Sequence, residues 1–185
     1  MLPGHGVHGM FSCMPILNLH ADNPMIDGRQ SQRALAIRRG VARLFGAAGH
    51  ALVAELPLAS GRRADIICLD GKGRFTIIEI KSSVEDFRVD NKWPEYHAHC
   101  DGFFFATLPD VPQEIFPEDE GLIVADSFGA EIIRDTQERT LAGATRRALL
   151  LRFARASAGR LERVLVHCDM NDEQLPPDVL NIDGS

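Results

Sequence analysis

Two short apolar runs joined by a glycine-rich turn constrain the fold of this chain most. Residues 64–69 (ADIICL) and 75–80 (FTIIEI) flank the sequence DGKG at residues 70–73. Apolar runs of this length, separated by a turn that contains glycine, predict a β-hairpin with a short loop. Each predicted strand also contains an acid, Asp65 in the first and Glu79 in the second, where an apolar strand ordinarily excludes one.

The register of the predicted hairpin brings these acids together. If Asp70 faces Arg74 across a three-residue loop, Asp65 lies opposite Glu79. Side chains that oppose each other in an antiparallel pair lie roughly 5 Å apart. Because side chains alternate along a strand, Lys81 shares the face of Glu79. We therefore expect two carboxylates and an ammonium group at one end of the hairpin.

This cluster predicts either a shared proton or a bound cation. Carboxylates this close repel each other, so one takes up a proton or a cation lies between them. Oxygen ligands from Asp65 and Glu79, with the backbone carbonyl of Ile80 nearby, suit Mg²⁺ or Mn²⁺. The structural alternative is an ion pair between Lys81 and one of the acids at the end of a buried sheet.

The spacing of these residues carries a resemblance. Asp65, then thirteen residues, then Glu79-Ile80-Lys81 resembles the D…E-x-K signature of the PD-(D/E)XK nuclease superfamily. The surrounding sequence, including RRADIICL, FTIIEIKSSVEDFRVDNKWPEYHAHCDGFFFAT and GLIVAD, resembles more narrowly the MmcB-like family of bacterial proteins associated with DNA repair. The resemblance covers about residues 30–163 and implies a restriction-endonuclease-like core. It also implies Mg²⁺-dependent hydrolysis of DNA phosphodiesters, with Mn²⁺ able to substitute, and endonuclease is favoured over exonuclease.

The resemblance assigns roles to the cluster. Asp65 and Glu79 would hold the metal ion, and Lys81 would orient the attacking water or stabilise negative charge. Glu55, the single acid of the preceding predicted strand, is a candidate third carboxylate. The sequence leaves open a second function class, a module that binds DNA or a repair partner on the same fold without cutting.

The candidate substrate-binding residues are basic or polar and lie near the cluster or on a basic helix. Two arginines lie just before Asp65 in the sequence and are expected to contact a phosphate or one of the acids. A lysine and a tyrosine four residues apart resemble the polar helix that often follows the E-x-K strand in the superfamily. One further arginine belongs to a predicted helix face that either contacts phosphates or is simply solvated. These residues are Arg62, Arg63, Lys92, Tyr96 and Arg39.

The order of predicted elements indicates an α/β domain with a mixed β-sheet flanked by helices. An αβββαβ order is followed by additional strands and a helix. Ser83 with Asp86 forms a capping pattern, and Pro94 is placed to open a helix. The predicted helices cover residues 30–48, a short segment after Ser83, a segment from Pro94 and residues 140–158; the strands cover 51–58, 64–69, 75–80, 102–107, 121–125 and 130–133.

Length and composition indicate one domain. The 185 residues are 45% hydrophobic and 25% charged, as in ordinary globular proteins. We expect a nuclease-like domain at residues 29–167, a disordered extension at residues 1–28 and a flexible acidic tail at residues 168–185. We expect no membrane span and no secretory signal, which indicates a cytoplasmic protein. The expected partners are DNA and other repair proteins, and the sequence leaves open whether the chain forms a homodimer.

The charge of the chain is unevenly distributed. The net charge is −6, but all 20 lysines and arginines lie between Arg29 and Arg163. The flanks outside this range hold 7 of the 26 acids, so the body carries 26 − 7 = 19 acids and a charge of about +1. An acidic overall charge therefore does not exclude binding to DNA.

Overall fold

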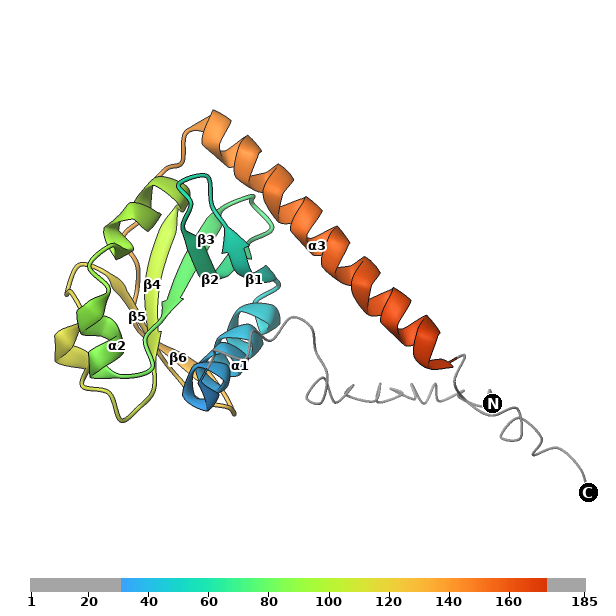
Figure 1. Cartoon of the computed structure of the whole chain (residues 1–185). Coiled ribbons are helices and arrows are strands. Elements are labelled where there is room, and N and C mark those ends of the chain that lie inside the picture. Colours follow the sequence, from blue (N-terminus) through green and yellow to red (C-terminus); the bar gives the residue numbers. More distant parts are fainter. Residues whose placement is uncertain (1–30, 173–185) are drawn as a thin grey trace, which may run out of the picture. The chain divides into compact units, whose positions relative to one another are not determined.

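The strands form one six-stranded mixed sheet in chain order, β1-β2-β3-β4-β5-β6. The structure is a computed structural model and describes residues 31–172. The predicted extension at residues 1–28, and residues 173–185 of the predicted tail, lie outside the described residues. The elements are α1 (Gln32–Ala47), β1 (Ala51–Pro57), β2 (Arg63–Leu69), β3 (Phe75–Ile80), α2 (Val84–Val89), the 3-10 helix η1 (Trp93–His99), β4 (Gly102–Thr107), the 3-10 helix η2 (Gln113–Ile115), β5 (Gly121–Ala125), β6 (Ala130–Arg134) and α3 (Gly143–Asp172) (Figure 1).

The sheet is antiparallel at both sides and parallel in the middle. β1, β2 and β3 pair antiparallel, β3, β4 and β5 pair parallel, and β6 returns antiparallel to β5. The predicted mixed sheet flanked by helices is therefore confirmed, and the architecture is compatible with a nuclease-like core. Because the three middle strands are parallel, their carboxyl ends lie at one edge of the sheet. Lys81, which follows β3, lies at this edge, and Thr107 Oγ1 of β4 donates a hydrogen bond to its backbone oxygen at 2.7 Å.

Helix α1 covers one face of the sheet. Ser31 caps its start, since the side-chain Oγ accepts a hydrogen bond from the Ala34 N–H at 3.1 Å. The buried stripe of α1 packs on the sheet, and the rings of Phe45 and Phe104 meet with centroids 6.2 Å apart. A Cβ on Gly40 would lie 2.2 Å from the Gly129 carbonyl oxygen, so glycine allows α1 to approach the turn between β5 and β6.

Helices α2 and η1 cover the opposite face. Consecutive side chains of β4 alternate between the two faces, so Phe103 and Phe105 point away from α1. Trp93 of η1 stacks on Phe103 with centroids 5.9 Å apart, and Phe87 of α2 meets Phe105 at 5.5 Å. Helices on both faces explain why β4 is buried along its whole length.

Helix α3 extends beyond its predicted end. The prediction ended the helix near residue 158, but α3 continues to Asp172, and the tail predicted from residue 168 therefore begins inside the helix. Gly159 does not break it, because an isolated glycine costs a helix only about 1 kcal/mol. Tertiary contacts compensate at the next residue, where the Arg160 guanidinium donates hydrogen bonds to the backbone oxygens of Ala54 and Glu55 in β1. No helix in the described part of the chain has the length and apolarity to cross a membrane.

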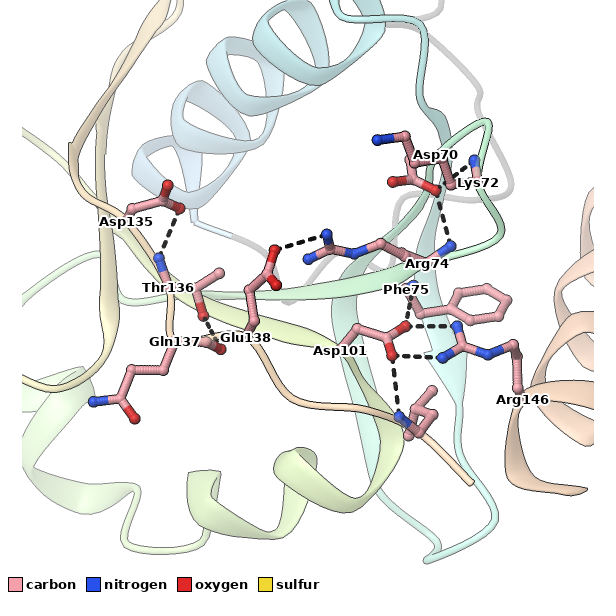
Figure 2. Close-up of polar contacts among 11 residues, drawn as sticks. Asp70, Lys72, Arg74, Phe75, Asp101, Asp135, Thr136, Gln137, Glu138 and Arg146 are labelled. Carbon is pink, nitrogen blue, oxygen red and sulfur yellow. Dashed lines mark hydrogen bonds and ion pairs between the residues drawn. The ribbon is translucent and has the colours of Figure 1, made fainter. Parts of the chain in front are cut away.

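Asp101 joins the start of β4 to β3 and α3. Its side chain is 3% exposed and forms a bidentate ion pair with Arg146 of α3, at 2.8 and 2.7 Å. It also accepts hydrogen bonds from the Phe75 N–H at 2.8 Å and from the Leu141 N–H at 3.1 Å (Figure 2). One buried carboxylate therefore receives four hydrogen bonds and holds three segments of the chain together.

Candidate functional site

The predicted hairpin and its register are confirmed. β2 and β3 pair with Ile66 opposite Ile78 and Leu69 opposite Phe75, and this register places Asp65 opposite Glu79. Asp65 Oδ2 accepts a hydrogen bond from the Ile80 N–H at 2.9 Å, which fixes the first acid against the second strand. The register follows from the three-residue loop that sequence analysis predicted.

Burial keeps both acids from ionising readily. Glu79 is 6% exposed, and burial, together with the charge of Asp65, raises its pKa to about 8. Burial also raises the pKa of Asp65, to about 6, although the Ile80 N–H favours the charged form. Glu79 Oε2 is buried and has no hydrogen-bond partner among the described residues. The pair therefore has the capacity to hold a proton or to bind a cation.

Lys81 lies beside Glu79 and is 4% exposed. Its Nζ lies 2.6 Å from Asp90 Oδ2 and 3.3 Å from Glu79 Oε1. Burial alone would lower the pKa of Lys81, but the charges of Glu79 and Asp90 outweigh it and raise that pKa. The ammonium group is therefore charged and oriented by two carboxylates.

Asp90 is a residue of the site that sequence analysis missed. It is the C-cap of α2, and its pKa is lowered because its hydrogen bonds from Lys81 and from the Lys92 N–H outweigh the effect of burial. The capping pattern predicted this helix: Ser83 Oγ accepts a hydrogen bond from the Asp86 N–H at 3.2 Å. The only signal for Asp90 was an acid at the end of a short helix, and the sequence does not show that the helix returns this acid to Lys81.

Glu55 lies next to Asp65 and Glu79. The sequence had left open whether this third acid reaches them. The register of β1 and β2 places Ala54 opposite Ile66 and Leu56 opposite Ala64, so Glu55 faces Asp65. Its charge contributes to the raised pKa of Asp65. Its backbone has a φ of 51°, an uncommon left-handed conformation for a residue other than glycine. Its carboxylate forms an ion pair with Arg63 Nε at 2.5 Å, so this acid already has a cationic partner in the structure.

The five candidate substrate-binding residues differ in their surroundings. Arg63 pairs with Glu55, and Arg62 forms a bidentate pair with Glu95, at 2.8 and 3.0 Å. Tyr96 is buried, and its hydroxyl donates a hydrogen bond to the Arg63 carbonyl oxygen at 3.0 Å. Burial, together with the charges of the nearby Glu79 and Asp65, raises the pKa of Tyr96.

Three of the five are exposed: Arg63, described above, and Lys92 and Arg39. Lys92 precedes η1 directly, and its backbone N–H donates a hydrogen bond to Asp90 Oδ1 at 3.0 Å. Arg39 lies on α1, outside the hairpin. The structure therefore brings Arg63 and Tyr96 to the cluster and leaves Arg39 on a neighbouring helix.

The described residues contain no group of three or more His, Cys, Asp or Glu side chains arranged to hold a metal ion. Asp65 and Glu79 nevertheless offer two carboxylates, and the buried Glu79 Oε2 has a free acceptor position. Oxygen donors of this kind suit Mg²⁺, which keeps several of its waters and binds through one or two carboxylates. The residues present therefore fit such an ion without a complete set of protein ligands.

Comparison with known proteins identifies the family of the chain. A family model described as DNA repair protein MmcB-like matches residues 21–168. The chain belongs to this MmcB-like family. Membership places it among DNA repair proteins, and the resemblance read from the hairpin and its flanking sequence is confirmed at the family level.

One solved structure is similar over most of the chain. It is the SPO1766 protein of unknown function from Silicibacter pomeroyi, which is 37% identical, with a TM-score of 0.71, over 80% of this chain and 98% of that chain. A search of curated proteins gave no match. A similar structure is thus found in a protein whose function is unknown.

Proposed function

We propose that this MmcB-like chain is a metal-dependent nuclease that hydrolyses DNA phosphodiester bonds, as an endonuclease, in DNA repair. The observation that carries the proposal is the buried Glu79 Oε2, which lacks a hydrogen-bond partner beside Asp65 and Lys81. An ionised oxygen in such a place is costly, and a bound cation would remove the cost. The D…E-x-K spacing on a hairpin supports the same chemistry.

Asp65 and Glu79 would supply the carboxylate oxygens for Mg²⁺, with Mn²⁺ able to substitute. The backbone carbonyl of Ile80 is a further candidate ligand, and Glu55 is another once it separates from Arg63. When bound, the ion would supply an activated water and a polarised phosphate. In this proposal the two carboxylates would hold the ion, and the ammonium group of Lys81 would attract the phosphate.

Lys81 would stabilise the negative charge that develops on the phosphate. Its raised pKa keeps the ammonium group charged at neutral pH, and Asp90 holds it at 2.6 Å. A preorganised cation in a buried site is worth more than the same charge in water. Tyr96, whose hydroxyl lies beside the acids, would help to exclude solvent from them.

A second candidate function is a module that binds DNA or a repair partner without cutting. The burial of Glu79 and Lys81, at 6% and 4% exposed, favours it, because little of either group is open to a phosphate and Lys81 is already paired with Asp90. In this alternative, Lys81 with its two acids stabilises the end of the sheet.

A cleavage assay distinguishes the two functions. The wild type and Lys81→Ala would be incubated with supercoiled, linear, single-stranded, nicked and branched DNA in Mg²⁺, Mn²⁺ or EDTA. We expect metal-dependent cleavage by the wild type and a rate at least about 100-fold lower for Lys81→Ala. Asp65→Asn and Glu79→Gln are expected to abolish cleavage while the circular dichroism spectrum stays that of the wild type.

Lys72→Ala is the matched control. Lys72 is an exposed lysine in the loop at the other end of the same hairpin, so we expect its variant to cleave like the wild type. Near-full activity of Lys81→Ala would rule out its proposed role. If the wild type binds DNA and cuts none of the substrates, the non-cleaving module becomes the better account.

A further inference from the structure

Helix α3 exposes an unusual amount of apolar surface. Ten large apolar side chains are exposed in the described part of the chain, and six of them lie on α3. On its inner side, α3 packs into the core through Leu149 and Phe153, each 5% exposed. The exposed apolar residues of the helix are Leu150, Leu151, Leu161, Val164, Leu165 and Val166.

Part of this surface follows a heptad pattern. Six residues of α3 follow one another at intervals of three, four, three, four and three positions and form a single row on the helix. We call this row the α3 stripe. Such alternating intervals are typical of helices that pair with another helix. At 100° per residue, the row lies about 130° around the helix from Leu149 and Phe153. The α3 stripe consists of Leu151, Ala154, Ala158, Leu161, Leu165 and Cys168.

The second part of α3 needs support that its own domain does not supply. The Arg160 guanidinium bonds to β1, but every residue from 161 to 167 is exposed. A helical segment of about 12 residues is marginal in water without packing. Leu161 and Leu165, at 60% and 50% exposed, lie in this segment and are available for packing.

We propose that the α3 stripe binds the α3 stripe of a second copy of this chain, with the two helices antiparallel. In the register centred on the stripe, Leu151 faces Cys168 of the second copy, Ala154 faces Leu165, and Ala158 faces Leu161. Each alanine then lies opposite a leucine, so large and small side chains alternate across the contact. A parallel arrangement would instead place alanine against alanine in two layers and leave space between the helices.

Charged residues beside the α3 stripe favour the same orientation. Arg155 and Glu162 flank the stripe on one side, and both are exposed. In the antiparallel register, Arg155 of each copy approaches Glu162 of the other, which forms two opposite-charge pairs by symmetry. A parallel pair would place neither Arg155 nor Glu162 beside an opposite charge of the second copy.

The proposed dimer does not depend on nuclease activity. Its two α3 helices would join two hairpin sites in one particle. If each site cuts one strand, the two sites of the dimer together can cut both strands of a DNA duplex. The dimer would serve a DNA-binding module equally well, because two linked binding sites increase the apparent affinity.

Sedimentation analysis of the full chain tests the proposal. The wild type is expected to show a concentration-dependent mass that rises from 20.4 kDa to twice that value. Leu161→Lys introduces a charge into the α3 stripe and is expected to remain at the mass of one chain, with unchanged helix content by circular dichroism. Val166→Lys is the control, because Val166 is 48% exposed on the same helix and lies outside the stripe; it is expected to dimerise.

Cross-linking tests the orientation. In a Cys13→Ser background, Leu151→Cys is expected to form a disulfide-linked dimer on oxidation, because residue 151 faces Cys168 of the second copy. The same background without Leu151→Cys is expected to remain uncross-linked. A wild type that stays at 20.4 kDa at every concentration, equal dimerisation of Leu161→Lys and the wild type, or a direct cross-link between two Cys168 residues would each overturn the proposal.

Discussion

At the scale of single residues, the site is defined by charged groups that burial has brought into close contact. Glu79 and Lys81 are each less than 10% exposed, and Asp65 and Asp90 complete the set. The ammonium group of Lys81 neutralises part of the acidic charge, yet the pKa values of Asp65 and Glu79 stay raised. Such clusters of perturbed carboxyl groups are frequent at functional sites.

Glu79 makes the stability of the metal-free protein depend on pH. Its pKa is about 8 in the folded protein and roughly 4.3 in an unfolded chain, so the folded state binds more protons between these values. Stability must therefore fall as pH rises through this window. We expect the free energy of unfolding of the wild type, relative to Glu79→Gln, to decrease by at least about 1 kcal/mol between pH 5 and pH 9.

Urea unfolding in EDTA at several pH values measures this difference. Glu85→Gln is the control, because Glu85 is an exposed acid on α2 and its variant should follow the wild type. Parallel pH profiles for the wild type and Glu79→Gln would show that Glu79 is ionised in the folded protein throughout this range.

At the scale of elements, polar side chains join segments that the sheet alone does not connect. Arg160 ties α3 to β1, the edge strand of the sheet that the described residues form. Arg33 at the start of α1 donates a hydrogen bond to the Ser82 oxygen at 3.0 Å and so reaches the residue after Lys81. Asp101 and Arg146 join β4 to α3.

Asp101→Asn is expected to destabilise the fold by about 3 kcal/mol, because it removes the charge of a buried carboxylate that accepts four hydrogen bonds, two of them from the half-buried Arg146 guanidinium. Glu138→Gln breaks a second arginine pair, with Arg74 at 2.8 Å, in which both side chains are exposed (Figure 2). This control is expected to change stability by less than about 1 kcal/mol. Thermal unfolding compares the two, and equal shifts in Tm would contradict the central role of Asp101.

At the scale of the whole molecule, the distribution of charge matters more than its sum. The net charge is −6, yet residues 139–163 hold seven basic residues and one acid. Many of the 20 basic residues are already paired within the fold, as Arg62 is with Glu95 and Arg33 with Asp110. Binding to DNA would therefore rely on exposed arginines that lie outside these pairs or exchange them for phosphates.

DNA binding is expected to weaken as salt concentration rises, because each neutralised phosphate releases counterions. If Arg39 on α1 contacts a phosphate, Arg39→Ala should reduce the slope of log affinity against log salt by about 0.9. Arg74→Ala, on the loop side of β3 beside Glu138, should leave the slope unchanged. Fluorescence anisotropy across a salt series measures both, and an unchanged slope for Arg39→Ala would remove Arg39 from the interface.

Much of the fold and the centre of the site could be predicted from the sequence. The turn at residues 70–73 and the apolar runs beside it predicted the register that pairs Asp65 with Glu79, because loop length determines which residues face each other in a hairpin. The strands at residues 102–107 and 121–125 were predicted with the bounds that the structure has. The predicted end of α3 near residue 158 was wrong, because a contact between Arg160 and β1 supports the helix beyond that point.

The sequence alone determined the hairpin, its acids, Lys81 and the alternation of elements, because these depend on side-chain period and turn chemistry among near neighbours in the chain. Only the tertiary structure decided that Asp90 holds Lys81, that Glu55 faces Asp65 and pairs with Arg63, and that Arg160 anchors α3. Each of these contacts joins two residues that belong to different helices, strands or loops. Their partners are set by sheet order and helix packing, which no local pattern in the chain specifies.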